Sequence, residues 1–196
     1  MSEVVAKSFY DETKNTYTLI DNGQPADGVK VEVTISHDDD NLIAEFEVIE
    51  KQLRRMATHH NDEVYEDSCV EIFIMKDGEE IYRNFELSAS MWALVGEGGP
   101  VGRHRLDPKQ IDKLERNIKI LENNNKRSHY LITEKINLRN WGFLAENEKI
   151  EDLKLKGNIY KCGDKLEEPH KLTLFEMREG YTTFHDPSCF QRIKFE

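Results

Sequence analysis

The stretch that decides the fold runs from residue 69 to residue 89 and reads CVEIFIMKDGEEIYRNFELSA. Its first residues alternate between an aliphatic face and a mixed face, which is the two-residue period of a β-strand. The Asp77-Gly78 pair follows, and Asp-Gly is favoured in two-residue type I′ turns because both central residues need positive φ. A second strand from Ile81 to Ala89 completes a predicted antiparallel hairpin.

The turn also predicts the register of this hairpin. With two turn residues, the expected opposite pairs are Lys76 with Glu79, Phe73 with Tyr82, Glu71 with Asn84 and Cys69 with Glu86. The other face pairs Ile74 with Ile81 and Val70 with Phe85, and we expect these residues in the core. A slip of the register by one residue would bury Glu71 or Asn84 instead.

Four polar side chains therefore gather on one face of the hairpin: Glu71, Tyr82, Asn84 and Glu86. Two carboxylates, an amide and a phenol on a rigid pair of strands suit the binding of hydroxyl groups. The alternative is an ordinary solvated face, which antiparallel sheets often have.

The rest of the chain shows the same period. A second hairpin is predicted from Val29 to Ile35 and from Leu42 to Val48, and further strands are expected at 130–136, 154–160, 171–177 and 190–195. Glycines between 96 and 102 predict a long loop. Asp107 before Pro108 predicts a helix start, with Ile111, Leu114, Ile118 and Leu121 at helical spacing and residues 123–125 as its end. A short helical turn is expected at 138–144.

These patterns predict an all-β fold, an antiparallel β-sandwich of the jelly-roll or immunoglobulin-like kind, with one minor helix. A chain of 196 residues is long enough for one sizeable core. No internal repeat or linker divides it, so we expect residues 1–196 to form a single domain.

The composition excludes some partners. A net charge of −11 argues against nucleic acid and against an anionic membrane surface, since both select clustered Lys and Arg. The chain has no apolar run of about 18 residues and no signal peptide at its start. The compartment stays open between the cytoplasm and secretion with a leader removed. Cys69, Cys162 and Cys189 are expected to be buried free thiols rather than one disulfide and one thiol.

The sequence contains candidate ligands for two kinds of metal site, zinc and calcium. Cys162, His170, His185 and Cys189 have spacings that fit no short zinc motif. Asp38, Asp39, Asp40 and Asp67 offer the hard oxygen donors that calcium prefers, and they are weak calcium candidates. The first three also form an ordinary turn sequence between two strands.

The sequence contains no P-loop, dinucleotide fingerprint, nucleophile elbow or zincin helix. Glu71 and Glu86 are the candidates for a pair of hydrolytic carboxylates, because diagonal neighbours on paired strands lie about 7–8 Å apart. That separation is close to what an inverting glycosidase needs. A shallow sheet face without a second wall favours binding over hydrolysis.

Three blocks of the sequence resemble carbohydrate-binding module family 9-like domains. Residues 64–74, VYEDSCVEIFI, resemble the family's strand Asp-(Asp/Ser)-x-Val-Glu-(Leu/Ile/Val)-Phe, and residues 82–87, YRNFEL, resemble its next strand. Residues 157–164 (GNIYKCGD), 169–170 (PH) and 184–190 (FHDPSCF) resemble the ending of the stand-alone bacterial branch. The order of the blocks matches from about residue 28 to the C-terminus.

The resemblance implies a β-sandwich with a sugar site, often associated with calcium and found on or beside xylanases. In the xylanase-attached members, two aromatic rings sandwich the terminal sugar while polar side chains hold its hydroxyls. Tyr65 stands where an aromatic residue precedes the acidic pair, and Glu71, Asn84 and Glu86 stand on the polar strand face.

The sequence also departs from the family. Residues 172–175 lack the Trp that many relatives have after the Pro-His pair. Trp92 or Trp141 is the candidate for the second aromatic wall, and either is also a candidate for the core. Five polar residues recur in the resemblance and are expected to form a structural polar network: Asn158, Lys161, Asp164, His170 and His185.

The leading hypothesis is non-catalytic carbohydrate binding. The expected ligands are the ends of plant-type polysaccharides or oligosaccharides, in support of xylan or cellulose degradation by a glycoside hydrolase partner, with calcium as the expected cofactor. The candidate ligand-binding residues are Tyr65, Glu71, Tyr82, Asn84, Glu86, Trp92 and Trp141. The alternatives are a small glycoside hydrolase that uses Glu71 and Glu86, and an interaction domain whose sugar site has decayed.

Overall fold

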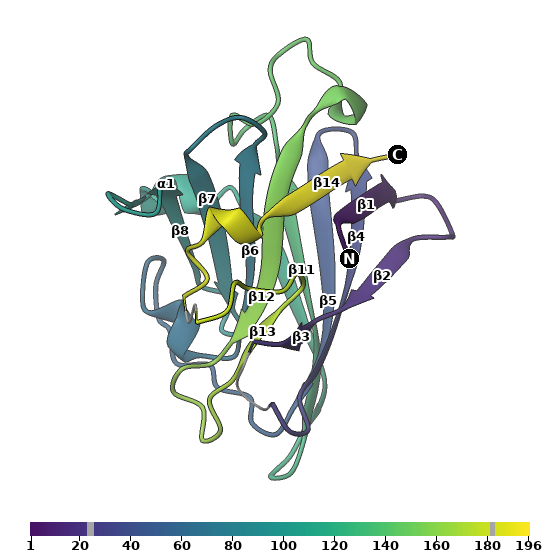
Figure 1. Ribbon diagram of the computed structural model, residues 1–196. Helices are drawn as coiled ribbons and strands as arrows, with labels where there is room; N and C mark the ends of the chain where they lie inside the picture. Colours follow the sequence, from purple (N-terminus) through teal and green to yellow (C-terminus); the bar gives the residue numbers. More distant parts are fainter. Residues whose placement is uncertain (23–25, 181–182) are drawn as a thin grey trace.

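Fourteen strands form two packed layers in the computed structural model, which describes residues 1–22, 26–180 and 183–196 (Figure 1). The first layer has the order β10 (Glu115–Asn123), β11 (Ser128–Asn137), β5 (Asn41–Glu50) and β4 (Lys30–Asp38), with β2 (Asn15–Thr18) also paired to β4. The second layer has the order β14 (Gln191–Phe195), β12 (Leu155–Cys162), β6 (Cys69–Lys76), β7 (Tyr82–Ser88), β8 (Ala93–Gly98) and β9 (His104–Arg105). Beside it, β13 (Lys171–Thr173) pairs with β12 and with β3 (Ile20–Asp21).

Strand β1 (Glu3–Ser8) joins the two layers. Its residues 3–6 pair in parallel with residues 192–195 of β14, and its residues 7–8 pair in parallel with residues 36–37 of β4. The remaining pairings among the described residues are antiparallel. The predicted all-β sandwich with a minor helix is confirmed.

The core lies between the layers. Alternate residues point inward from both sides, as the two-residue period requires. The inward side chains include Val31, Val33, Ile35, Phe46, Tyr130 and Ile132 of the first layer and Val70, Ile72, Ile74, Phe85 and Leu87 of the second. The hairpin predicted between Val29 and Val48 is confirmed, with Asp39 at φ 39° in its turn.

The register of the β6–β7 hairpin differs from the prediction by two residues. Glu71 lies opposite Glu86, and Phe73 lies opposite Asn84. The turn is longer than two residues, because Glu79 N donates to Lys76 O and the second strand begins only at Tyr82. Ile81 is consequently exposed and not in the core. A slip of two residues leaves every side chain on its predicted face.

The helix predicted after Asp107 is much shorter than expected. Asp107 does cap a helix, since its Oδ1 accepts a 2.8 Å hydrogen bond from Lys109 N, but this helix, α1, spans only Pro108–Ile111. Ile118 and Leu121 belong to strand β10, which pairs with β11 from Glu115 to Asn123. The free edge of β11 offers hydrogen bonds along its whole length, and this tertiary pairing overrides a spacing that also fits a helix.

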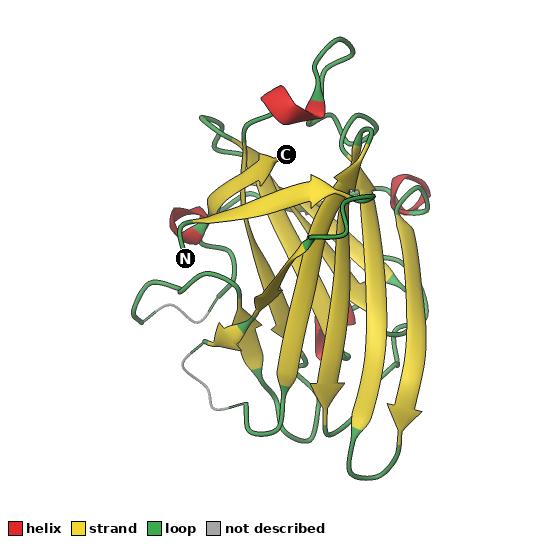
Figure 2. Ribbon diagram, turned by 90° about the vertical axis from the view of Figure 1, so that its right-hand side faces the viewer, coloured by secondary structure: helices red, strands yellow, loops and turns green. Residues whose placement is uncertain are grey.

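Other irregular segments also differ from their predictions. The glycine loop expected at 96–102 begins later, because β8 continues to Gly98, and the strand expected at 171–177 ends at Thr173. Residues 138–144 form turns in which Phe143 N and Leu144 N both donate to Leu138 O. Helical structure beyond α1 is limited to three 3-10 turns, η1 (Val64–Glu66), η2 (Ile150–Asp152) and η3 (Pro187–Cys189), within the described residues (Figure 2).

The outer face of the second layer is covered rather than solvated. Chain segments before β6 and before β14 pack over it, and the second of these crosses in front of β12 and β6 in Figure 1. A second apolar cluster results, which contains Val64, Cys69, Phe73, Met75, Tyr82, Leu94, Tyr160, Cys162, Phe184 and Phe190. The candidate functional site lies on this covered outer face of the second layer.

Candidate functional site

A pocket of about 560 Å³ opens on the outer face of strands β6, β7, β8 and β12. Its walls come from segments far apart in the sequence. Its lining consists of Tyr65, Glu71, Asn84, Glu86, Leu94, Gly96, Arg103, His104, Arg105, Cys162, Asp164, Lys171, Thr183, Phe184 and His185. The sequence predicts a shallow sheet face here, whereas the segments that cover this face turn it into a walled pocket.

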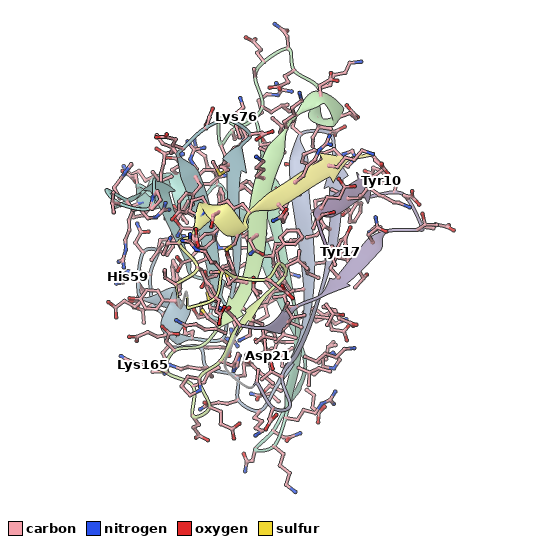
Figure 3. The ribbon with its side chains drawn as sticks, in the orientation of Figure 1. Tyr10, Tyr17, Asp21, His59, Lys76 and Lys165 are labelled. Atoms are coloured by element: carbon pink, nitrogen blue, oxygen red, sulfur yellow. The ribbon has the colours of Figure 1, made fainter. Side chains whose placement is uncertain are left out.

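The pocket lies near the N-terminal end of β6. Lys76, at the other end of β6, lies far from His59 and Lys165 in Figure 3. Residues next to Lys165 close this side, because Asp164 N donates to Tyr65 O and Lys165 N donates to Glu66 O. These bonds fix the loop after β12 against the segment that carries Tyr65.

Three polar side chains, Glu71, Asn84 and Glu86, form what we call the polar floor. Glu71 and Glu86 are cross-strand partners, and Asn84 Nδ2 donates a 2.7 Å hydrogen bond to Glu86 Oε1. The three residues are only 3%, 2% and 5% exposed. Ligand hydroxyls can therefore reach them only through the pocket.

Burial changes the protonation of the two floor glutamates. Loss of hydration disfavours a charged carboxylate, so it raises the pKa of Glu71 well above its usual value, with the neighbouring Cys162 and Glu86 adding to the effect. Burial likewise raises the pKa of Glu86 to about 7, although the hydrogen bond from Asn84 opposes the shift. At neutral pH the floor therefore offers hydroxyl donors as well as acceptors.

Arg103 supports the floor from the side. Its guanidinium lies 3.9 Å from the centre of the Tyr82 ring, and its Nη2 donates to Asn84 Oδ1. A second bond of 2.8 Å runs from Arg103 Nη1 to Gly98 O. Gly96 makes this approach possible, because a Cβ at that position would lie 2.7 Å from Asn84 Oδ1. Asn84 is thus held by groups on both sides.

Aromatic side chains form the walls. Half-buried Tyr65, buried Phe184 and half-buried His185 all line the pocket. Phe184 stacks on Tyr160 with ring centres 4.1 Å apart, and His185 Nδ1 is 2.9 Å from the Tyr82 hydroxyl. Burial lowers the pKa of His185 to about 4, with the Arg103 charge as a second cause, so its ring is neutral at pH 7.

The predicted site residues divide into three groups. Tyr65, Glu71, Asn84 and Glu86 line the pocket, while Tyr82 lies fully buried beneath Arg103 and does not line it. Neither tryptophan lies at the pocket, which corrects both proposals for a second wall. Trp141 is 2% exposed and packs edge-on against Phe85 in the core. Trp92 packs against His60 beside a different hollow.

The expected calcium donors do not come together. Asp38 Oδ2 accepts from Lys135 Nζ at 2.9 Å, and Asp40 forms an ion pair with Arg139. Asp67 lies elsewhere, buried, and accepts hydrogen bonds from Met56 N, Ala57 N and Ser88 Oγ. The carboxylates of Asp38, Asp40 and Asp67 already have partners, and among the described residues the four aspartates Asp38, Asp39, Asp40 and Asp67 do not cluster around one calcium position. Calcium stays a prediction without assigned ligands.

The recurring C-terminal residues serve two purposes. Lys161 and His170 both contact the buried carboxylate of Glu50, and Lys161 Nζ lies 2.8 Å from Glu50 Oε2. The side chain of Asn158 donates a hydrogen bond to Phe175 O and accepts one from Phe175 N. This matches the expected structural network. Asp164 and His185 line the pocket instead. Among the described residues, Cys162, His170, His185 and Cys189 do not come together as one zinc ligand set.

Several pocket residues were missed: Leu94, Gly96, Arg103, His104, Arg105, Lys171 and Thr183. Other lining residues outside the predicted set, Cys162, Asp164, Phe184 and His185, do carry a sequence signal, through the resemblance of residues 157–164 and 184–190. The missed residues lie on strands β8, β9 and β13, except for Arg103 and Thr183, which lie in loops. Their approach to the pocket depends on tertiary packing. Among the described residues, no helix has the length and apolar character needed to cross a membrane.

Comparisons with known proteins bear on the family and the fold of the chain. The sequence profile described as "Carbohydrate-binding family 9" matches residues 19–195. No curated protein matches the chain.

Solved structures share the fold. A "putative carbohydrate-binding protein" from Bacteroides uniformis superposes with a TM-score of 0.86 at 22% identity, covering 100% of this chain and 99% of that one. A family 9 module from Caldicellulosiruptor kristjanssonii in complex with cellotriose gives a TM-score of 0.66 at 12% identity, covering 99% and 93%. The same organism's module in complex with glucose gives 0.61 at 12% identity, covering 99% and 95%.

Proposed function

The chain belongs to carbohydrate-binding family 9, and we propose that its outer-face pocket binds the end of a plant-type oligosaccharide or polysaccharide without cleaving it. The observation that carries this proposal is the polar floor between aromatic walls. Sugar rings have apolar C–H faces that pack on flat rings, and hydroxyls that need fixed hydrogen-bond partners.

The burial of the floor supports recognition of a chain end. Glu71, Asn84 and Glu86 are almost fully buried, so a ligand must insert a sugar into the pocket to contact them. Tyr65 and Phe184 line the same pocket and offer aromatic surface to an inserted sugar ring. The volume of about 560 Å³ lies within the range of roughly 300–1,000 Å³ that small-ligand pockets have.

The proposed ligand class is a β-linked glucan or xylan, and the proposed role is to support its degradation by a glycoside hydrolase partner. The cellotriose and glucose complexes of the Caldicellulosiruptor modules support the glucan. Sedimentation with insoluble cellulose and with xylan would separate the two polymers.

Hydrolysis by Glu71 and Glu86 has less support. A glycosidase divides its two carboxyl groups between a neutral acid and an ionised base or nucleophile. Here burial raises the pKa of both glutamates, to about 7 for Glu86 and well above its usual value for Glu71. The pair therefore lacks a carboxylate that stays ionised, whereas binding needs none.

Titration calorimetry with cellotriose, xylotriose, glucose and xylose tests the proposal. We expect one site per chain, weakened about tenfold or more by Asn84→Ala and by Glu86→Gln, because each removes hydrogen-bonding capacity from a buried site. Tyr65→Ala should also weaken binding, through loss of one wall. Glu134→Gln is the matched control, because Glu134 is equally buried but lies on β11 in the other layer.

Chromatography of the same sugars after long incubation decides the alternatives. Cleavage that disappears in both Glu71→Gln and Glu86→Gln would replace binding by hydrolysis. A folded wild-type protein that binds none of the sugars would support an interaction domain with a decayed site.

A further inference from the structure

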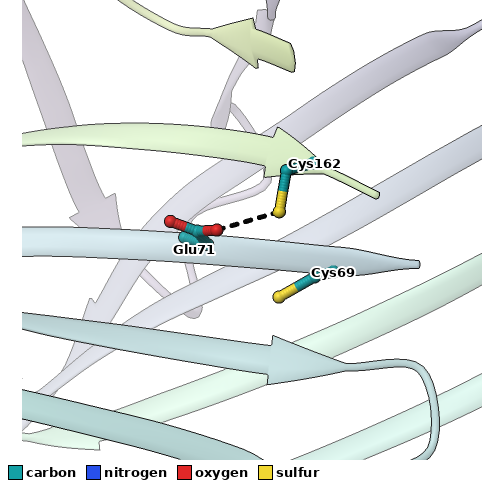
Figure 4. A group of neighbouring side chains, drawn as sticks. All are labelled: Cys69, Glu71 and Cys162. Carbon is teal, nitrogen blue, oxygen red and sulfur yellow. Dashed lines mark hydrogen bonds between the residues drawn. The ribbon is translucent and has the colours of Figure 1, made fainter. Parts of the chain in front are cut away.

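Two cysteines and a glutamate lie together at the base of the pocket. Cys69 and Glu71 are on β6, and Cys162 is the direct cross-strand partner of Cys69 on β12. Residues 69 and 71 are two apart on one strand, so both side chains point to the outer face (Figure 4). The two Sγ atoms and a Glu71 carboxylate oxygen lie within 4.8 Å of one another.

We propose that Cys69, Glu71 and Cys162 form a binding site for a zinc-type divalent metal ion. The site goes beyond the proposed sugar binding, because the ion needs no sugar to bind.

The donor types select the metal. Thiolates favour zinc and related soft or borderline ions over calcium and magnesium, and a carboxylate is an accepted third ligand of zinc. Tetrahedral zinc with bonds of about 2.0–2.3 Å places its donor atoms roughly 3.6–3.8 Å apart. The Cys162 Sγ to Glu71 Oε1 distance is 3.0 Å, so movements of about an ångström convert the present cluster into a coordination shell.

The surroundings leave room for a fourth ligand. Glu71 and Cys162 line the pocket, whereas Cys69 is fully buried behind them. An ion held by the three side chains would therefore have one coordination position on the pocket side, open to water or a ligand oxygen. Arg103 and Arg105 line the same pocket and would offset the negative charge of two thiolates and a carboxylate.

The cluster has the chemistry of a site that needs a cation. Two thiols and a carboxyl group, each able to release a proton, are buried together. A metal ion replaces these protons and stabilises all three anions at once. Cys189 differs, because its only nearby acid is Asp186, with Sγ 3.7 Å from Oδ2, and no second thiol adjoins it among the described residues.

Cobalt titration of freshly reduced, anaerobic protein tests the proposal. One equivalent of Co²⁺ should produce thiolate-to-cobalt charge-transfer absorption in the near ultraviolet, and one equivalent of Zn²⁺ should abolish it. Cys69→Ser and Cys162→Ser should each weaken Co²⁺ binding by more than the roughly 10- to 100-fold that loss of an outer-shell partner costs. Glu71→Gln should weaken it while keeping the charge-transfer band at saturating Co²⁺.

Cys189→Ser is the control and should bind Co²⁺ like the wild type. A second measurement needs no variant: Zn²⁺ should protect two of the three thiols of the wild-type protein from a thiol reagent. Absence of the charge-transfer band, wild-type Co²⁺ affinity in both serine variants, or protection of no thiol would overturn the proposal. Protein purified without a reducing agent that shows only one reactive thiol after denaturation would also overturn it, because Cys69 and Cys162 would then form a disulfide.

Discussion

Replacing Gly96 with alanine tests the position of the polar floor without removing any of its side chains. A Cβ on residue 96 would lie 2.7 Å from Asn84 Oδ1 and 3.3 Å from Arg103 Nη2. Such contacts are too short, so the Asn84 amide must move. Its movement disrupts the 2.7 Å bond from Asn84 Nδ2 to Glu86 Oε1 and the bond that Asn84 accepts from Arg103.

The expected loss follows from those two bonds. A hydrogen bond that involves a charged group contributes about 1.5–3 kcal/mol, so displacing Asn84 should weaken sugar binding by about that amount. This corresponds to a roughly 10- to 150-fold rise in Kd. The free energy of unfolding should change less, because alanine restricts the unfolded chain and thereby offsets about 0.4–1 kcal/mol of the strain.

The assay is titration calorimetry with cellotriose, beside thermal unfolding of each variant. Gly99→Ala is the matched control, since its Cβ would meet no atom closer than Val101 O at 3.7 Å. If Gly96→Ala bound cellotriose as tightly as Gly99→Ala and the wild type, Asn84 would not position the ligand and the reasoning would be refuted.

Three further predictions concern stability. Glu86 has a pKa of about 7 in the folded state against a usual value of 4.5, so the folded state keeps a proton that the unfolded state loses. The free energy of unfolding should therefore fall by on the order of 3 kcal/mol as pH rises from about 4.5 to 7, with Glu71 acting in the same direction. Glu86→Gln should flatten this pH dependence in denaturant titrations. Trp141→Ala should lower the free energy of unfolding by about 3–5 kcal/mol because it leaves a cavity in the core, whereas Trp92→Ala should lower it far less. Neither variant should change the affinity for sugar, and a specific loss of sugar binding in Trp92→Ala would show that Trp92 belongs to the site. Lys161→Met should lower the free energy of unfolding by about 3–5 kcal/mol because it leaves Glu50 buried and charged. In chemical denaturation, the double variant with Glu50→Gln should recover part of that loss. Full additivity of the two single effects would contradict the ion pair.

The sequence was sufficient to place Glu71, Asn84 and Glu86 on one face, because strand alternation depends only on whether residues are an odd or even number apart. The predicted partners are wrong, because the prediction makes Asp77-Gly78 the whole turn, whereas the loop continues to Ile81. A two-residue error changes which side chains face each other but not which face they occupy.

The covering of that face could not be predicted locally. Arg103 and Thr183 reach the pocket from segments about 20 and 100 residues away from β7, and no local pattern records that approach. Ile118 and Leu121 show the same limit, because their spacing fits a helix until the free edge of β11 is considered. Trp141 shows it too, since a lone tryptophan in a turn gives no sign of which layer it packs against.

The parallel pairing of β1 with β14 has a mechanical consequence. The two strands carry the ends of the chain, and residues 3–6 run beside residues 192–195 in the same direction (Figure 1). A stretching force applied to the two ends pulls these strands past each other along their length. Their hydrogen bonds, continued by Glu196 N to Ala6 O, would then bear the load together rather than separating one by one. The module should therefore resist extension between its ends more strongly than peeling of either terminal strand.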